Sequence, residues 1–397
     1  MTVAESGAPL TIGIEEEYLL IDPETRDLAI DPPRAILDAC ETMIRAEDGA
    51  VTPEFLRAQI EVATPVCHSI GEARARVAYL RGCVATAAAE YGLRPIAVST
   101  HPFAKWSLQQ HTDGDRYNML AEDMQQVAQR LLICGMHVHV GIDDPNIRND
   151  MLNQVSYFLP HLLALTTSSP FWQGRMTGLM CYRLSVFDEL PRTGLPERFD
   201  SHAEYTRHVD ALIEAGLIED ASKIWWDVRA HSKFPTLEMR IADICTRMDD
   251  GITVAALYAC LLSMLMRLRR RNQRWRVYSN MLVRENRWRA QRYGIDRGLV
   301  DFGQGRIVDY AALLDEILDL IREDAERLDC VAEVEHTRNI VARGTSAHGQ
   351  IARYRDAKAA GATETEALRA VVDWLAVETL QGVSPAGAGN RRGQTPD

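Results

Sequence analysis

Carboxylate and imidazole side chains recur at alternate positions in four short segments of this chain. The segment TIGIEEEYLLID carries Glu15 and Glu17, and the segments AQIEVAT, CGMHVHVGI and TLEMRIADI carry Glu61, His137 and Glu238. Carboxylates that converge without compensating lysines repel one another, and a divalent cation relieves this repulsion. A carboxylate-rich set with few nitrogen ligands suits Mg²⁺ or Mn²⁺ better than zinc. The residues therefore predict a metal-dependent enzyme that uses Mg²⁺-bound ATP.

Strand geometry explains how these side chains would meet. Successive residues of a strand point to opposite faces, so a strand over residues 11–21 places Glu15 and Glu17 on one face and Glu16 on the other, among apolar side chains. The same alternation predicts three more strands, at residues 58–64, 134–142 and 236–244. We expect one antiparallel or mixed sheet with helices on its apolar face and a polar face open to a ligand, which is an α+β architecture. Glu16 then needs a basic partner in the helix layer.

Helix signals occur throughout the rest of the chain. Three capping boxes predict helix starts, formed by Ser69 with Glu72, Ser201 with Glu204, and Thr363 with Glu366. Apolar spacing predicts further helices at residues 150–168, 250–272 and 309–328. The apolar run at residues 254–266 is shorter than a membrane span and indicates a buried helix. We expect residues 1–381 to form a single catalytic domain and residues 382–397 a disordered tail.

Composition restricts the class of partner. The net charge of −12 argues against a non-specific binder of nucleic acid or of anionic membranes, because the overall field repels phosphate. The N-terminus lacks the pattern of a signal peptide, and the eight cysteines lack paired spacing, so we expect a cytoplasmic protein with reduced thiols. The expected partners are small-molecule substrates and other copies of the chain in a homo-oligomer.

Seven longer motifs resemble one known family. They are GIEEEYLLID, GMHVHVGI, SPFWQGRMTGLMCYR, ELPRTGLP, FPTLEMRIAD, ENRWRAQRYG and GTSAHGQ. Together they are similar to the bacterial glutamate–cysteine ligase type 2 family, the carboxylate-amine ligases, over about residues 10 to 380. The resemblance implies a glutamine-synthetase-like fold, a curved and mainly antiparallel sheet whose polar face binds ATP, two or more Mg²⁺ and an amino-acid carboxylate. The implied reaction joins L-glutamate or a similar carboxylate to L-cysteine or another amine, through an acyl phosphate and with release of ADP.

The resemblance also implies roles for individual residues. The metal ligands would be the five residues that strand alternation selects: Glu15, Glu17, Glu61, His137 and Glu238. Glu238 and Arg240 would act in catalysis, with Arg240 stabilising the transferring phosphoryl group. The other nucleotide contacts would come from Arg292, Thr345 and Ser346. The substrate contacts would come from Arg183, Thr177 and His139, with Arg183 holding a carboxylate in bidentate fashion.

One segment departs from the family pattern. After QGR the family carries Asp-Thr-Gly, whereas this chain carries Met176, Thr177 and Gly178, and Met180 with Cys181 replaces Ala-Ser before YR. Because this segment is expected to face substrate, the change bears on the identity of the carboxylate or the amine. We therefore expect only slow glutamate–cysteine ligase activity.

Two other functions fit the same residues. A guanidino-kinase-like phosphotransferase would use the same metal logic without forming an amide, and a non-catalytic protein would bind metal and nucleotide without turnover. The arginine-rich segment at residues 267–276 has two interpretations as well. It is either a nucleic-acid patch or, as we favour, the solvated and salt-bridged end of a helix.

Overall fold

The structure is a computed structural model that describes residues 10–383. The predicted disordered tail lies outside these described residues, apart from its first two positions. The main sheet has seven strands in the order β10-β11-β5-β1-β3-β2, with β4 paired to β1, and its pairings are antiparallel. Its strands are β1 (Ile12–Ile21), β2 (Ala50–Pro53), β3 (Gln59–Ala63), β4 (Arg94–Ile96), β5 (Met136–Gly141), β10 (Val228–Ala230) and β11 (Thr236–Met239). The α+β class and the mainly antiparallel sheet are thereby confirmed.

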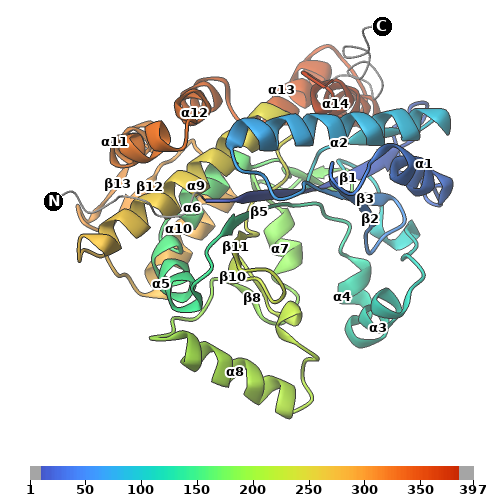
Figure 1. Cartoon of the computed structure of the whole chain (residues 1–397). Helices are drawn as coiled ribbons and strands as arrows, with labels where there is room; N and C mark the ends of the chain where they lie inside the picture. Colours follow the sequence, from blue (N-terminus) through green and yellow to red (C-terminus); the bar gives the residue numbers. More distant parts are fainter. Residues whose placement is uncertain (1–9, 384–397) are drawn as a thin grey trace, which may run out of the picture.

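Helices cover one face of this sheet. Figure 1 shows α2 (Ile70–Glu90) and α9 (Met248–Arg270) above the sheet, with α8 (His202–Glu214) on the opposite side. The remaining helices are α1 (Ala35–Met43), α3 (Asp115–Met124), α4 (Gln126–Gln129), α5 (Pro145–Val155), α6 (Leu159–Thr166), α7 (Arg183–Phe187), α10 (Asn280–Tyr293), α11 (Tyr310–Arg327), α12 (Val331–Arg343), α13 (Ser346–Ala359) and α14 (Glu364–Thr379).

Short elements complete the chain. Three two-stranded sheets are formed by β6 (Phe171–Trp172) with β7 (Arg175–Met176), β8 (Thr193–Gly194) with β9 (Trp225–Trp226), and β12 (Leu299–Asp301) with β13 (Arg306–Val308). Two 3₁₀ turns lie at Trp106–Leu108 and Ala221–Lys223.

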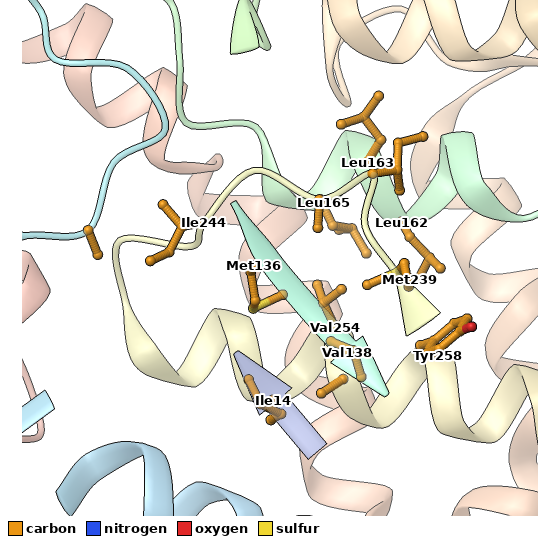
Figure 2. Close-up of a cluster of buried hydrophobic side chains, with 14 of the residues drawn as sticks. Ile14, Met136, Val138, Leu162, Leu163, Leu165, Met239, Ile244, Val254 and Tyr258 are labelled. Atoms are coloured by element: carbon orange, nitrogen blue, oxygen red, sulfur yellow. The ribbon is translucent and has the colours of Figure 1, made fainter. Parts of the chain in front are cut away.

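The apolar face of the sheet builds the core. Ile14 of β1 and Met136 and Val138 of β5 are buried beside Val254 and Tyr258 of α9, as Figure 2 shows. Helix α9 is long and apolar enough to cross a membrane, yet most of its apolar window is buried inside the protein. Its apolar composition is therefore that of a core helix, as the sequence predicted.

The predicted capping boxes lie at helix starts. Ser69 accepts a hydrogen bond from the Glu72 backbone N–H at 3.1 Å before α2, and the predicted hydroxyl caps also precede α8 and α14. The predicted single helix at 150–168 is wrong, because α5 ends at Val155 and α6 begins at Leu159. Pro160 explains the break, since proline lacks a backbone N–H and is tolerated in the first turn of a helix.

The fourth predicted strand is shorter than expected. β11 ends at Met239, because the N–H groups of Arg240 and Ile241 both donate to the carbonyl of Asp227, which is the pattern of a bulge. The distances are 2.8 and 3.0 Å. Beyond the bulge, the chain pairs again with the segment at the start of β5, through the Met136 N–H to the Ala242 carbonyl and a bridge between Gly135 and Asp243.

Glu16 has the basic partner that its position demands. Both Glu16 and Arg81 of α2 are 1% exposed, and Arg81 Nε and Nη2 each donate to a different Glu16 oxygen at 2.7 Å. The other three guanidinium hydrogens go to the carbonyls of Thr246, Thr379 and Cys245 at 2.8, 3.2 and 3.0 Å. All five donors of Arg81 are thus used, which is the condition under which a buried ion pair is tolerated.

We expect Arg81→Met to destabilise the protein by about 3–5 kcal/mol, because Glu16 would remain buried without a counter-charge. Urea unfolding measures the change. The matched control is Arg74→Met on the same helix, where an exposed pair with Asp249 should contribute less than about 1 kcal/mol. Equal losses in the two variants would contradict the assigned role of Arg81.

Candidate metal and nucleotide site

The polar face of the sheet brings the predicted ligands together. Glu15 stands opposite His137 in the β1–β5 register, Glu17 stands opposite Glu61 in the β1–β3 register, and Glu238 stands opposite His139 across β5 and β11. Directly opposed residues in an antiparallel pair have Cβ atoms about 5 Å apart. Three neighbouring strand pairs therefore gather three carboxylates and their opposed partners on one surface.

His137 and Glu15 form the centre of this surface. The Nδ1 atom of His137 lies 3.0 Å from Glu15 Oε2, and its Nε2 lies 3.9 Å from Glu17 Oε1. Burial, and then the charge of Arg240, lower the pKa of His137 to about 4, so the imidazole is neutral near pH 7. With the Nδ1 proton assigned to the bond with Glu15, Nε2 offers a lone pair beside Glu17. A neutral histidine oriented in this way is a suitable metal ligand.

The carboxylates around Glu17 are crowded. Burial and then the charge of Glu54 raise the pKa of Glu17 to about 8, and burial with the charges of Glu54 and Glu15 raises the pKa of Glu61 well above its ordinary value. Glu17 Oε2 accepts a 2.7 Å hydrogen bond from the Gly135 backbone N–H, which fixes its direction. Burial and the repulsion between neighbouring carboxylates both disfavour the charged forms, and a bound dication would offset both effects.

Glu15 and Glu238 are held in the ionised form. Burial opposes the charge of Glu15, but hydrogen bonds from the two strand histidines outweigh it and keep its pKa below the ordinary value. Burial likewise opposes the charge of Glu238, and Arg240 and Arg229 lower its pKa. Arg229 Nε donates to Glu238 Oε2 at 2.6 Å, and Arg240 contacts Glu238 Oε1. Both Glu238 oxygens thus have a guanidinium partner, so a metal would take the remaining lone pairs.

Among residues 10–383, three overlapping groups could hold a metal ion, with the ligand atoms of each group within 4.8 Å of one another. They are Glu15, Glu61 and His137; Glu15, His139 and Glu238; and Glu17, Glu54 and Glu61. Glu15 and Glu61 each belong to two groups, so a shared carboxylate could bridge neighbouring ions. Oxygen-rich sets of this kind fit Mg²⁺ or Mn²⁺.

Two residues of the candidate metal site, Glu54 and Arg229, were not predicted from the sequence. Glu54 lies just beyond the end of β2, outside any strand alternation, so no local pattern marked it. Arg229 stands opposite Glu238 in the β10–β11 register. Recognising the hairpin that joins β10 to β11 would have identified Arg229, because its parity places it on the polar face.

The predicted substrate contacts lie in different surroundings. His139 Nδ1 lies 3.1 Å from Thr236 Oγ1, and its Nε2 lies 3.3 Å from Glu15 Oε1. His139 therefore lies among the carboxylates on the polar face of the sheet. Arg183 is buried, and its guanidinium donates to the carbonyls of Arg240 and Ile241 at 3.3 and 3.4 Å. Thr177 donates to the carbonyl of Pro170 at 3.0 Å, within its own turn.

A glycine makes room for Arg183. A Cβ on Gly135 would lie 2.4 Å from Arg183 Nη2, so any other residue at this position would displace the guanidinium. The guanidinium consequently lies against the backbone that precedes β5. Its nearness to Glu17 is reflected in the opposing effect of Arg183 on the raised pKa of Glu17.

The predicted nucleotide contacts are not gathered with the carboxylates. Thr345 and Ser346 line a cavity of about 240 Å³ that also includes Thr246, Arg343 and Trp374. Thr246 accepts a hydrogen bond from Arg81, the partner of Glu16, so this cavity lies on the helix-covered side of the sheet. No local sequence pattern indicates this position, because tertiary packing decides on which side of the sheet the start of α13 lies. Of the four predicted nucleotide contacts, only Arg240 contacts the carboxylates on the polar face of the sheet.

Arg292 is exposed on α10, and its guanidinium lies over the ring of Tyr293, 5.0 Å from the centroid.

The arginine-rich segment at residues 267–276 forms the salt-bridged end of a helix, which is the interpretation that we favoured. Arg267 pairs with Asp324 at 2.8 Å, and Arg269 and Arg274 both reach Asp150, at 3.2 and 3.4 Å. These arginines join the end of α9 to its neighbours.

Comparisons with known proteins agree on one family. The family model described as glutamate-cysteine ligase family 2 matches residues 11–373. A relative from Rhodospirillum rubrum, named "Putative glutamate--cysteine ligase 2", is 59% identical over 95% of this chain and 97% of its own length. A relative of the same name from Jannaschia sp. is 54% identical over 92% of this chain and 95% of its own length.

Two solved structures share the fold. The glutamate–cysteine ligase of Francisella tularensis has a TM-score of 0.68 at 13% identity, covering 94% of this chain and 89% of that one. A bifunctional glutathione synthetase of Pasteurella multocida has a TM-score of 0.65 at 13% identity, covering 94% of this chain and 52% of that one. At this level of identity the similarity concerns the fold alone.

We expect the stability of the metal-free protein to fall as the pH rises from about 6.5, the ordinary pKa of histidine, to about 8. The pKa of Glu17 is about 8 in the folded protein against an ordinary value of 4.5, so the folded state binds more protons than the unfolded chain in this window. The lowered pKa values of Glu15 and Glu238 affect stability only below this window. The buried histidines His101, His137 and His161, whose pKa values are lowered to about 4, also act below it, where they make stability rise with pH.

Mg²⁺ should therefore raise the thermal midpoint more at pH 8 than at pH 5, which differential scanning calorimetry can measure. Glu17→Gln is the control, because it removes the titrating group and should flatten the pH dependence. A larger Mg²⁺ effect at pH 5 would contradict the assignment.

Proposed function

The chain belongs to glutamate-cysteine ligase family 2, and on this premise we propose that it joins L-glutamate, or a similar carboxylate, to an amine with the hydrolysis of ATP to ADP and phosphate. Membership in the family makes it a ligase that forms carbon–nitrogen bonds. The observation that carries the proposal is the convergence of Glu15, Glu61 and His137 from three adjacent strands onto one polar face.

The proposed metal ligands are Glu15, Glu17, Glu61, His137 and Glu238, with Glu54 added from the geometry. When bound, Mg²⁺ would neutralise the nucleotide phosphates and favour attack at the γ-phosphoryl group. The chain's own residues prepare this surface. His137 keeps a neutral imidazole, and the Gly135 N–H orients Glu17. The crowded carboxylates make the site selective for a doubly charged cation.

Arg240 is the proposed catalytic cation. It is held by Glu238 on one side and lies 3.5 Å from His137 Nδ1 on the other, so its guanidinium is fixed among the metal ligands. Arg229 holds the second oxygen of Glu238 and acts as a positioning residue. A preorganised guanidinium in a partly buried site can stabilise the charge of the transferring phosphoryl group without reorganisation.

The proposed chemistry has two steps. The substrate carboxylate first takes the γ-phosphoryl group of ATP, which yields an acyl phosphate and ADP. The amine nitrogen then attacks the acyl carbon, so a C–N bond forms, the C–O bond to phosphate breaks, and the nitrogen releases its extra proton to solvent. Arg183 and His139 remain the proposed contacts for the substrate carboxylate, and Thr345, Ser346 and Arg292 carry no role in this scheme, given their positions.

We expect ADP and inorganic phosphate to appear only when Mg²⁺, L-glutamate and an amine are all present, since phosphoryl transfer and amide formation are coupled. Coupled ADP detection and mass spectrometry of the product measure this. L-cysteine should be a slow acceptor, because Met176 replaces an acidic residue of the family pattern and is exposed on β7.

The products distinguish the rival mechanisms. AMP with pyrophosphate would point to an adenylate and contradict the acyl phosphate. A stable phosphorylated acceptor without an amide would indicate a phosphotransferase instead. Full activity in the presence of excess EDTA would contradict the metal requirement.

A further inference from the structure

A second cavity lies beside α8, away from the main core. Its volume is about 340 Å³, and its apolar wall consists of Phe199, Tyr205, Val209, Leu212, Ile224 and Trp226. Polar side chains complete the lining, from Arg192, Glu197, Arg198, Glu204 and His208. Phe199, Tyr205, Val209 and Ile224 also belong to a small hydrophobic cluster that is separate from the main core. Protein interiors normally leave few voids larger than a water molecule, so an apolar cavity of this size is a candidate ligand site.

This cavity lies on the same side of the sheet as the carboxylates. Arg229, which holds Glu238, also donates to the carbonyls of Ser222 and Ile224 at 3.0 and 3.1 Å. Ile224 lines the cavity, so one guanidinium spans from the cavity wall to the catalytic carboxylate. Burial raises the pKa of Tyr205, and the charge of Arg229 opposes that shift, which places this ring near Arg229 as well.

The cavity beneath α13 differs in its position. It lies on the helix-covered side of the sheet. A ligand there would be separated from the carboxylates by the sheet. The α8 cavity is the one that could place an apolar group near the reacting atoms.

We propose that the α8 cavity binds the apolar part of the amine substrate, so that the preferred acceptor is an amine with an aromatic or bulky aliphatic group. This inference rests on the proposed function. The side chain of cysteine would fill little of the space, whereas a cavity of about 150 Å³ already admits a benzene ring. The rings of Phe199, Tyr205 and Trp226 approach one another with centroids 5.5 to 6.3 Å apart, a surface suited to stacking with an aromatic group.

The test compares 2-phenylethylamine with ethylamine as acceptors for L-glutamate and ATP. The wild-type protein should prefer 2-phenylethylamine by about 10-fold or more in kcat/KM, the scale at which an apolar pocket discriminates. Val209→Phe should reduce this ratio about 10-fold or more, mainly through KM, because the larger ring occupies the cavity. Ile213→Phe is the matched control, since Ile213 lies on the same helix, exposed and outside the cavity lining, and should keep the wild-type ratio.

Calorimetric titration of the full chain with 2-phenylethylamine, without ATP, separates this inference from the proposed function. Binding that is lost in Val209→Phe and kept in Ile213→Phe supports the cavity even if no acceptor is turned over. Absence of saturable binding to the wild-type chain, or equal binding to both variants, would overturn the inference. Thermal midpoints of both variants establish that each is folded.

Discussion

The bidentate ion pair between Glu16 and Arg81 is the interaction on which the site depends. It buries the middle glutamate of three on the helix side of β1, where all donors of Arg81 are satisfied. A shift of one residue along β1 would turn Glu15 and Glu17 into the apolar core and Glu16 toward the polar face. Packing and charge therefore select the register that leaves two carboxylates for metal.

The polar face follows from that register. Glu15 and Glu17 each face a potential ligand on the neighbouring strand, and the raised pKa of Glu17 shows how strongly the surface disfavours a further negative charge. In the proposed function, a bound cation would both stabilise the fold and prepare the site for phosphates. Arg229 extends this arrangement, because it links Glu238 to the wall of the α8 cavity. In the proposed function, metal binding, catalysis and acceptor choice would thus be connected through two neighbouring strands.

Sequence alone was sufficient for the parts of the site that follow strand alternation. Period-two patterns placed Glu61, His137 and Glu238 on one face with the β1 glutamates, and capping boxes located helix starts. The sequence was insufficient where tertiary packing decides which distant segments meet at the site. Glu54 follows a strand end, and Thr345 and Ser346 lie at the start of α13, whose side of the sheet is set by packing with α14 and α9.

The most direct measurement is Mg²⁺ titration by calorimetry, together with ATP turnover, for the variants Glu15→Gln, Glu16→Gln and Glu17→Gln. The account predicts that the outer two lose Mg²⁺ affinity and about 10²-fold or more in turnover while they remain folded. Glu16→Gln should keep Mg²⁺ affinity and lose about 1–3 kcal/mol of stability. Loss of Mg²⁺ binding in Glu16→Gln with normal binding in Glu15→Gln would contradict the register and the site built on it.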